Sequence, residues 1–297
     1  MANVISKGTL FPAKLVEDMF NAVRGKSALA ALSDREPLAF TGNEIMTFTM
    51  DNEVDIVAEN GPKSNGGATV TPVTVAPVKV EYGVRVSDEF IYAAEEDQLR
   101  YLETFAEGFA RKVARGLDLM AMHGVNPRTG QASAVIGDNN FDSKIPGANT
   151  VKDATSDAVE MAVSFVEGAE HDVTGLAMSP SFRAILASEK TEGGTPLFPE
   201  LAWGSNPGVV RGLQTEINST VSANQSLDRA FVGNFRDFFR WGYARDINIE
   251  VIEYGNPDND ATAGDLKGHN QVYLRGEAYI GWGILDPAAF AKIEAKE

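Results

Sequence analysis

The sequence predicts an α+β protein built along one long helix. From Ser87 to Gly124, apolar residues recur at steps of three and four, which is the spacing of one apolar face on a helix. The stretch before it, from Ile45 to Val86, alternates with period two and is rich in valine and threonine, as strands are. Because the β-patterned stretches on either side are too thin to form compact domains, we expect them to lie along the helix.

The helix, predicted over residues 88–123 and here termed the spine helix, has recognisable ends. Ser87 can cap its first turn, and Asp88 and Glu89 lie where the positive end of the helix dipole favours anions. Gly124 follows the last apolar residue, where a left-handed C-cap requires no Cβ. At 1.5 Å per residue the helix would be roughly 50 Å long.

Composition excludes several classes of protein. The 297 residues are enough for about two domains, and the formal net charge of −16 argues against a general binder of nucleic acid or anionic membranes. The absence of cysteine excludes disulfides and thiolate metal sites. No apolar window has the length of a signal peptide or a membrane span. We expect a soluble, cytoplasmic chain.

Residues 1–43 are predicted to form a weakly helical arm, interrupted by glycine and proline. Its first 35 residues carry five basic side chains against three acidic ones, so the arm is mildly basic while the rest of the chain is acidic. Residues 25–27 (GKS) match the end of a phosphate-binding loop. Phe20 stands where that motif requires glycine, so nucleotide binding is not expected.

Residues 44–86 are predicted to form a long two-stranded ribbon. A glycine-rich stretch at 61–67 (GPKSNGG) marks its tip, and Pro72 and Pro77 cannot donate to a β-ladder. A ribbon of this length has no core of its own. It can pack on a sheet of the same domain or lie on another subunit, and the pattern alone favours neither.

The second half of the chain alternates between strand and helix patterns, which suggests a small α/β domain. The predicted elements are a helix over 155–170, a strand over 173–178, a helix capped by Ser179, strands over 231–239, 241–252 and 271–285, and a short terminal helix after Asp286-Pro287.

Motifs for catalysis are absent. His123, His171 and His269 are widely separated and have no metal-ligand spacing, so we expect each to be satisfied or solvent-facing. No serine-nucleophile elbow or dinucleotide fingerprint is present. The sequence therefore predicts no catalytic, cofactor-binding or metal-binding residues.

The polar loop over 255–270 begins like a calcium loop, with Asn256, Asp258 and Asp260 at alternate positions. However, Ala261 and Lys267 stand where an EF-hand requires glycine and glutamate. We expect a solvated acidic loop, with an adventitious cation as the second interpretation.

The order of these parts resembles that of the major capsid proteins of tailed bacteriophages, which have the Hong Kong 97-type (HK97-like) fold. The pieces that carry the resemblance are 86–89 (VSDE) entering the long helix, 123–130 after it, 177–181 (AMSPS), 193–198 (GGTPLF), 233–235 (GNF), 275–278 (RGEA) and 287–291 (PAAFA). Each piece is short, but their order covers nearly the whole chain.

The resemblance implies a division of the chain. It implies an N-terminal arm (1–43), an extended β-ribbon or E-loop (44–86), a peripheral domain (87–153 and 238–284) that contains the spine helix, and an axial domain (154–237 and 285–297). It also implies that the arm and the ribbon are intersubunit elements, which decides between the two placements of the ribbon.

The implied function is structural and not enzymatic. The chain would self-assemble, as hexamers and pentamers, in the host cytoplasm into the icosahedral head that encloses double-stranded DNA. Portal, scaffolding and decoration proteins would be partners, DNA would be contacted only non-specifically, and no cofactor or membrane is implied. Some family members carry a cleaved N-terminal scaffolding segment, whereas this chain starts almost directly at the arm. It would be either a mature form or a chain with a separate scaffold, and Met1 favours the second. An encapsulin-like shell protein is the alternative, and a hydrolase without a recognisable motif is a more distant one.

Some shells of this family are covalently cross-linked, from a lysine of the extended loop to an asparagine of a neighbouring subunit, assisted by a glutamate. The matching residues would be Lys63 in the ribbon tip, Asn270 and Glu277, where a glutamate in an apolar pocket with a raised pKa would accept the ammonium proton. The ribbon-tip residues as a set are Gly61, Pro62, Lys63, Gly66 and Gly67. The plain alternative is a solvated lysine, a turn asparagine and a glutamate paired with Arg275.

Overall fold

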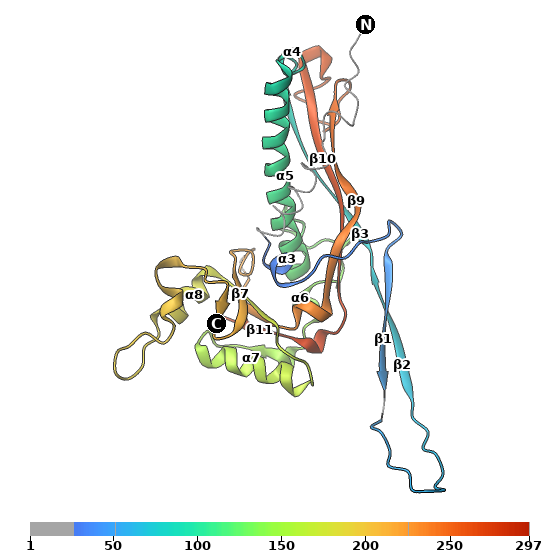
Figure 1. Cartoon of the computed structure of the whole chain (residues 1–297). Helices are drawn as coiled ribbons and strands as arrows, with labels where there is room; N and C mark the ends of the chain where they lie inside the picture. Colours follow the sequence, from blue (N-terminus) through green and yellow to red (C-terminus); the bar gives the residue numbers. More distant parts are fainter. Residues whose placement is uncertain (1–26, 51, 225, 297) are drawn as a thin grey trace.

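The computed structural model describes residues 27–50, 52–224 and 226–296, so the predicted helical pieces of the arm before Ser27 lie outside the described residues. Two layers and one projecting ribbon make up the described chain (Figure 1). The first layer is a three-stranded sheet with a long helix along it, the second is a six-stranded sheet with its own helices, and the ribbon extends away from both.

The long helix α5 (Glu95–His123) lies along an antiparallel sheet with strand order β3–β10–β9. These strands are β3 (Pro77–Ser87), β9 (Phe239–Ile252) and β10 (Gln271–Ile284). Leu102, Phe109 and Leu117 of the helix are buried, as the spacing predicted. A Cβ at Gly276 of β10 would lie 3.0 Å from the Phe109 ring, so the glycine lets helix and sheet approach closely.

The spine helix begins later than predicted. A short helix α4 (Glu89–Tyr92) comes first, and Ala93 and Ala94 then adopt extended backbone before α5 starts. The side-chain amide of Gln98 donates to the carbonyls of Ile91 (3.0 Å) and Ala93 (2.9 Å), which satisfies the end of α4 and stabilises the break. The predicted C-terminus is confirmed, because Gly124 caps α5 with a φ of 65°.

The second layer has strand order β4–β11–β8–β5–β7–β6. Its strands are β4 (Thr150–Val151), β5 (Gly175–Met178), β6 (Val209–Val210), β7 (Leu213–Ile217), β8 (Asp228–Gly233) and β11 (Phe290–Glu294). Helices α7 (Ser156–Gly168) and α8 (Pro180–Ser188) pack on it around a separate apolar core. Ser179 caps α8 as predicted, since its hydroxyl accepts from the Phe182 N–H at 3.2 Å.

Two predictions in this half are wrong. The predicted strand over 231–239 is interrupted by helix α9 (Phe235–Phe238), because the Asn234 side chain accepts from the Asp237 N–H and starts a turn. The predicted terminal helix is instead one 3-10 turn, Pro287–Ala289, followed by β11. Strand β11 pairs with β8 along its length and with β4 at Lys292 and Ile293, so the strand pairing satisfies backbone groups that a helix would satisfy internally.

The ribbon consists of β1 (Asn43–Met50) and β2 (Ala68–Val75), paired antiparallel with Asn43 opposite Val75. After Ala76 the chain leaves the ribbon and continues as β3 beside β10. The paired ribbon is therefore shorter than the stretch 44–86 predicted for it. Figure 1 shows it projecting from the body of the subunit.

A buried carboxylate joins the two layers. Asp118, on α5, accepts hydrogen bonds from the backbone N–H groups of Ala28 (2.9 Å) and Leu29 (3.2 Å) at the start of helix α3 (Ala28–Leu32). It also accepts from the hydroxyls of Ser27 (2.5 Å) and Thr220 (2.7 Å). The side chain is fully buried, and burial raises its pKa against the opposing effect of these donors. Asp118 therefore fixes both α3 and the loop after β7 to the spine helix.

We predict that Asp118→Ala strongly destabilises the subunit, because it leaves four buried donors without their acceptor. The free energy of unfolding should fall by roughly 3–5 kcal/mol, measured by denaturant unfolding of unassembled subunits. Asp138→Ala, at an exposed aspartate, is the matched control and should stay within about 0.5 kcal/mol of the wild type. Equal stability of the two variants would contradict the role assigned to Asp118.

Candidate functional site

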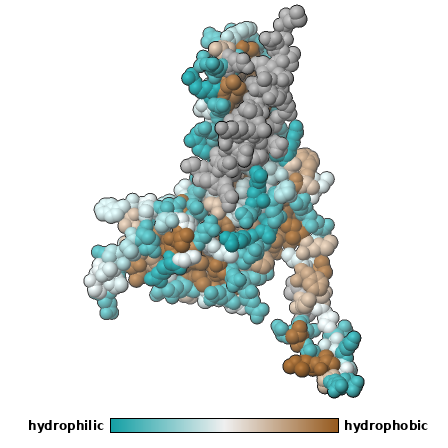
Figure 2. All heavy atoms as spheres, viewed as in Figure 1, coloured by the Kyte–Doolittle hydropathy of each residue, from teal (hydrophilic) through white to brown (hydrophobic). Residues whose placement is uncertain are grey.

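The ribbon presents an uncovered apolar face. Met46, Phe48 and Met50 alternate along β1 and are 60–72% exposed, and Val70 lies opposite Phe48 on β2. Figure 2 shows hydrophobic side chains gathered toward the far end of this projection. Side chains at alternate positions share one face of a strand, and a two-stranded ribbon is marginal alone. The ribbon therefore has the properties of a binding surface for another molecule.

The ribbon is anchored only at its base. Val75, the last residue of β2, is fully buried, and a Cβ at Gly283 of β10 would lie 2.7 Å from its side chain. In contrast, Ile56, in the connection between β1 and β2, is 96% exposed. The predicted tip residues, Gly61, Pro62, Lys63, Gly66 and Gly67, all lie in this connection, and Lys63 is exposed.

The structure places Asn270 just before β10 and Glu277 in the middle of that strand. Asn270 occupies the left-handed turn before the strand, with a φ of 52°, and its carbonyl accepts from the Asp88 N–H. Glu277 lies seven residues on, roughly 23 Å along an extended strand. The ribbon with Lys63 projects away from this sheet (Figure 1). One subunit thus does not bring the three candidate cross-linking residues together.

Glu277 lies among cations and not in an apolar pocket. Its carboxylate is 2.7 Å from the Lys79 ammonium and 3.2 Å from Nε of Arg275. The bond from Lys79 and the charges of Arg275 and Lys79 together lower the pKa of Glu277 below its ordinary value, although burial opposes them. The expectation of a raised pKa is therefore wrong for this subunit, and pairing with Arg275 agrees with the plain alternative.

The acidic loop is folded around an arginine that sequence reasoning did not identify. Arg85 of β3 donates through Nε to Asp258 (2.8 Å) and through Nη2 to Asn256 (2.7 Å) and the Gly264 carbonyl (2.9 Å). The bond from Arg85 lowers the pKa of Asp258 to about 2. The loop is largely exposed to solvent, as expected, but Arg85 also orders it, and the guanidinium supplies the positive charge that a metal ion would supply in a calcium loop.

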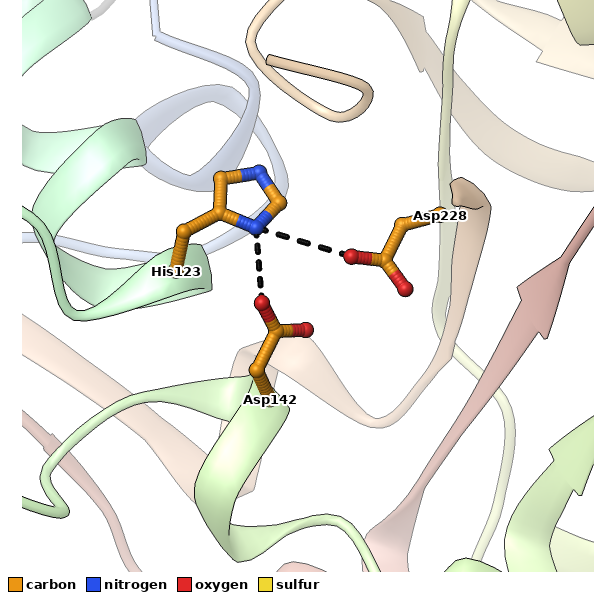
Figure 3. A group of neighbouring side chains, drawn as sticks. All are labelled: His123, Asp142 and Asp228. Atoms are coloured by element: carbon orange, nitrogen blue, oxygen red, sulfur yellow. Dashed lines mark hydrogen bonds and ion pairs between the residues drawn. The ribbon is translucent and has the colours of Figure 1, made fainter. Parts of the chain in front are cut away.

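A cluster of titratable side chains lies where the two layers meet (Figure 3). His123 is the last residue of α5, Asp142 lies in helix α6 (Phe141–Lys144), and Asp228 begins β8. Nδ1 of His123 is 2.8 Å from Asp142 and 3.5 Å from Asp228. The side chains of His123 and Asp228 are each 3% exposed.

The geometry requires a proton between His123 and Asp142. Nε2 of His123 lies 2.9 Å from the Thr220 carbonyl, which can only accept, so Nε2 carries a hydrogen. Nδ1 then faces a carboxylate oxygen, and two acceptors at this distance would repel each other. One additional proton, on the imidazole or on the carboxylate, converts the contact into a hydrogen bond.

The surrounding charges favour that proton. Burial lowers the pKa of His123, but the hydrogen bond with Asp142 and the charges of Asp142 and Asp228 raise it above its ordinary value. Burial and the charge of Asp142 raise the pKa of Asp228 to about 6. The Lys292 ammonium, on β11, lies 3.8 Å from both aspartates and 2.8 Å from Glu294.

The three donor atoms, within 4.8 Å of one another, are a set that a metal ion could use. Lys292 already supplies a positive charge there, so we assign the cluster to proton binding.

The other two histidines also have partners, since His171 contacts Asp286 at 3.0 Å and His269 contacts the Asp265 carbonyl at 2.9 Å. The expectation that each histidine is satisfied or solvent-facing is confirmed for all three.

None of the helices in the described ranges is both long and apolar enough to cross a membrane.

Comparison with known proteins adds a consistent set of similarities. The model of the phage capsid family matches residues 7–295. The chain is 24% identical over 298 residues to the probable major capsid protein gp17 of Mycobacterium phage D29. The aligned region covers 97% of this chain and 90% of that protein.

Solved structures show the same similarity. A chain from Mycobacterium phage Ogopogo superposes with a TM-score of 0.75 at 33% identity, covering 91% of this chain and 92% of that one. A chain from the capsid of a native GTA particle superposes with a TM-score of 0.66 at 15% identity, covering 91% and 90%. The first match extends to sequence, whereas the second shows the fold alone.

We predict that the cluster in Figure 3 makes the subunit less stable as the pH rises. Asp228 binds its proton more tightly in the folded subunit than in the unfolded chain. The bound proton therefore stabilises the fold fully below the pKa of Asp228 in the unfolded chain, and this stabilisation is lost as the pH rises past about 6. Protonation of His123 also contributes stability that is lost as the pH rises, because the pKa of His123 is likewise raised in the folded subunit. Between about pH 4 and about pH 7 the wild type should lose roughly 1–3 kcal/mol relative to Asp228→Asn.

The measurement is denaturant unfolding of unassembled wild-type and Asp228→Asn subunits at a series of pH values. Taking the difference between the two chains removes the contribution of every other titrating group that the substitution leaves unchanged. A difference that stays constant with pH, or that grows in favour of the wild type as the pH rises, would contradict the assignment.

Proposed function

This chain belongs to the phage capsid family and is a major capsid protein of a tailed phage, and we propose that its copies build the icosahedral head around double-stranded DNA. Its α+β architecture is the HK97-like fold. A capsid protein acts by assembling into a multimeric shell, so its first partner is another copy of itself. The observation that carries the proposal is the projecting ribbon, whose apolar face no other part of the described subunit covers.

We propose that the two layers are the peripheral and axial domains of the capsid fold. The layer of α5 with β3, β9 and β10 would be peripheral, and the six-stranded sheet would be axial. Strand pairing supports a slightly different division from the boundaries at 87 and 154. Strand β3 pairs with the peripheral strand β10, and β4 pairs with the axial strand β11.

We propose that the ribbon rests on a neighbouring subunit. Burial of its exposed methionine, phenylalanine and valine side chains there would supply a hydrophobic contact that one subunit cannot make. Each such contact would be modest, and a closed shell would sum many of them.

The remaining partners follow from the same role. Hexamers and pentamers would form the faces and vertices of the head in the host cytoplasm, with portal, scaffolding and decoration proteins attached. The mildly basic arm would face the interior, where it meets scaffold or DNA non-specifically, and the acidic surplus would keep other surfaces from adhering to DNA. No enzymatic step is proposed.

Electron microscopy of the chain, expressed with scaffolding proteins from tailed phages, tests the function. We expect closed particles of megadalton mass, because many identical weak contacts cooperate in a shell. Small cargo-filled cages would instead support the encapsulin-like alternative. A chain that stays monomeric in every such condition would overturn the proposal.

Deleting residues 59–69 should leave the subunit folded but reduce shell yield, because the tip contributes little to the subunit core and much to the neighbour contact. Phe48→Ser, on the exposed apolar face, should act in the same direction. Thr47→Ser, at the adjacent position on the opposite face of β1, is the matched control. Unchanged yield and thermal stability of shells from the deletion would contradict the intersubunit placement.

The covalent cross-link stays a prediction, because it depends on where Lys63 of one subunit meets Asn270 of another. In the isolated subunit, Lys79 and Arg275 make Glu277 a weaker base, so the cross-link requires assembly to change that environment. Boiled mature shells on a denaturing gel should then show a ladder that disappears in Lys63→Ala. A single monomer band from fully expanded wild-type shells would exclude the cross-link.

A further inference from the structure

A fully exposed tryptophan lies on the six-stranded layer. Trp203, in the 3-10 segment η2 (Pro199–Gly204), is 103% exposed, whereas the other two tryptophans, Trp241 and Trp282, are almost fully buried. Burying an indole is strongly favourable in water, so full exposure leaves a large hydrophobic surface unused in the single subunit. Tryptophan is also among the residues most enriched at the energetic centres of protein interfaces.

The backbone holds this side chain outward at a cost. Trp203 has a φ of 57° and a ψ of 27°, the left-handed region that bulky residues avoid. The segment beneath it is firmly attached, because Leu201 is fully buried and its carbonyl accepts from Arg183 at 2.8 Å. An unfavourable backbone conformation on a fixed base is typical of a residue placed for contact.

The same layer contains an apolar groove that Trp203 does not fill. The groove has a volume of about 210 Å³ and lies between α7, α8 and β6. A cavity of about 150 Å³ lined by apolar side chains is enough to bind benzene, so this groove can take an aromatic ring. Its apolar lining consists of Val159, Val163, Leu176, Leu186, Phe198, Val210 and Leu213.

The rim of the groove suits an indole in particular. Arg211 lies with its guanidinium carbon 4.6 Å from the centre of the Phe198 ring, and its side chain is half exposed. Glu160, on α7, lies 3.5 Å from the Arg211 guanidinium. A guanidinium above an aromatic ring is a favourable arrangement, and its free face can stack on a second ring.

We infer that Trp203 of one subunit inserts into this groove on the next copy of the chain. The inference rests on the proposed function, which makes a second copy the expected partner. A protruding side chain and a receiving groove at different places on one molecule form a head-to-tail contact, and such contacts close into rings when the rotation between copies permits. Each subunit in a ring of axial domains would then give one tryptophan and receive one.

Tryptophan fluorescence tests the contact in wild-type shells. Subtracting the emission of Trp203→Phe, which lacks the indole, leaves the signal of Trp203. In free subunits this signal should be at long wavelength and readily quenched by acrylamide. In shells it should shift to shorter wavelength and be protected from acrylamide. Shells seen by electron microscopy in which Trp203 is quenched as in free subunits would overturn the inference and leave the proposed function standing.

Substitutions test how much Trp203 contributes to assembly. Trp203→Gly should leave the subunit at least as stable to heat, since glycine adopts a positive φ freely, yet raise the concentration needed for assembly by roughly tenfold or more. Trp203→Phe should retain part of the contact. Val159→Trp fills the groove from its own subunit and should impair assembly as Trp203→Gly does, with folding checked by circular dichroism.

The outcomes separate the two claims. Assembly of folded Trp203→Gly and Val159→Trp subunits at the wild-type concentration would overturn the inference alone. A wild-type chain that forms no shells with any scaffold would overturn the proposed function, and this inference with it.

Discussion

The fold depends on one buried carboxylate. Asp118 accepts from two backbone N–H groups and two hydroxyls, and these donors come from the start of α3 and from the loop after β7. Apolar packing alone would hold the two layers together without fixing their relative orientation, because hydrophobic contact is not directional. Hydrogen bonds to a buried charge are directional and costly to lose. Asp118, together with the bond from His123 to the Thr220 carbonyl, therefore fixes how the six-stranded layer is oriented on the spine helix.

The orientation matters because the two surfaces proposed to contact neighbouring subunits lie on different layers. The ribbon leaves the body at Val75, beside β10, whereas Trp203 and its groove belong to the six-stranded layer. A subunit that must meet several neighbours at once needs these surfaces at a fixed angle. The cluster of His123, Asp142, Asp228 and Lys292 lies at the same junction and adds ionic contacts whose strength depends on bound protons.

Periodicity predicted the elements that have a strong local pattern. The apolar spacing identified α5, the glycine at 124 identified its end, and the valine- and threonine-rich alternation identified the ribbon strands. The assignment to a capsid fold came from the order of short motifs along the chain, which composition could not supply. The uncovered apolar face of the ribbon agrees with that assignment, and its placement on a neighbour stays a proposal.

The remaining features depend on partners distant in sequence. The break at Ala93 and Ala94 depends on the side chain of Gln98, although alanine favours helix. Arg85 folds a loop more than 170 residues away, and nothing in its own alternating strand indicates this. Asp118 lies on an apolar helix face 90 residues from the N–H group of Ala28 that it binds. An isolated acidic residue in an apolar stripe was the available signal for this site.

In the proposed shell, each subunit lies under a neighbour's ribbon. A cryo-electron microscopy reconstruction of assembled shells, at a resolution that shows side chains, tests it most directly. We expect density for β1 and β2 over an adjacent subunit, with Met46, Phe48 and Met50 buried in that contact and the Asp118 junction unchanged. A ribbon folded back against its own three-stranded sheet, with those side chains exposed or buried within one subunit, would contradict the account.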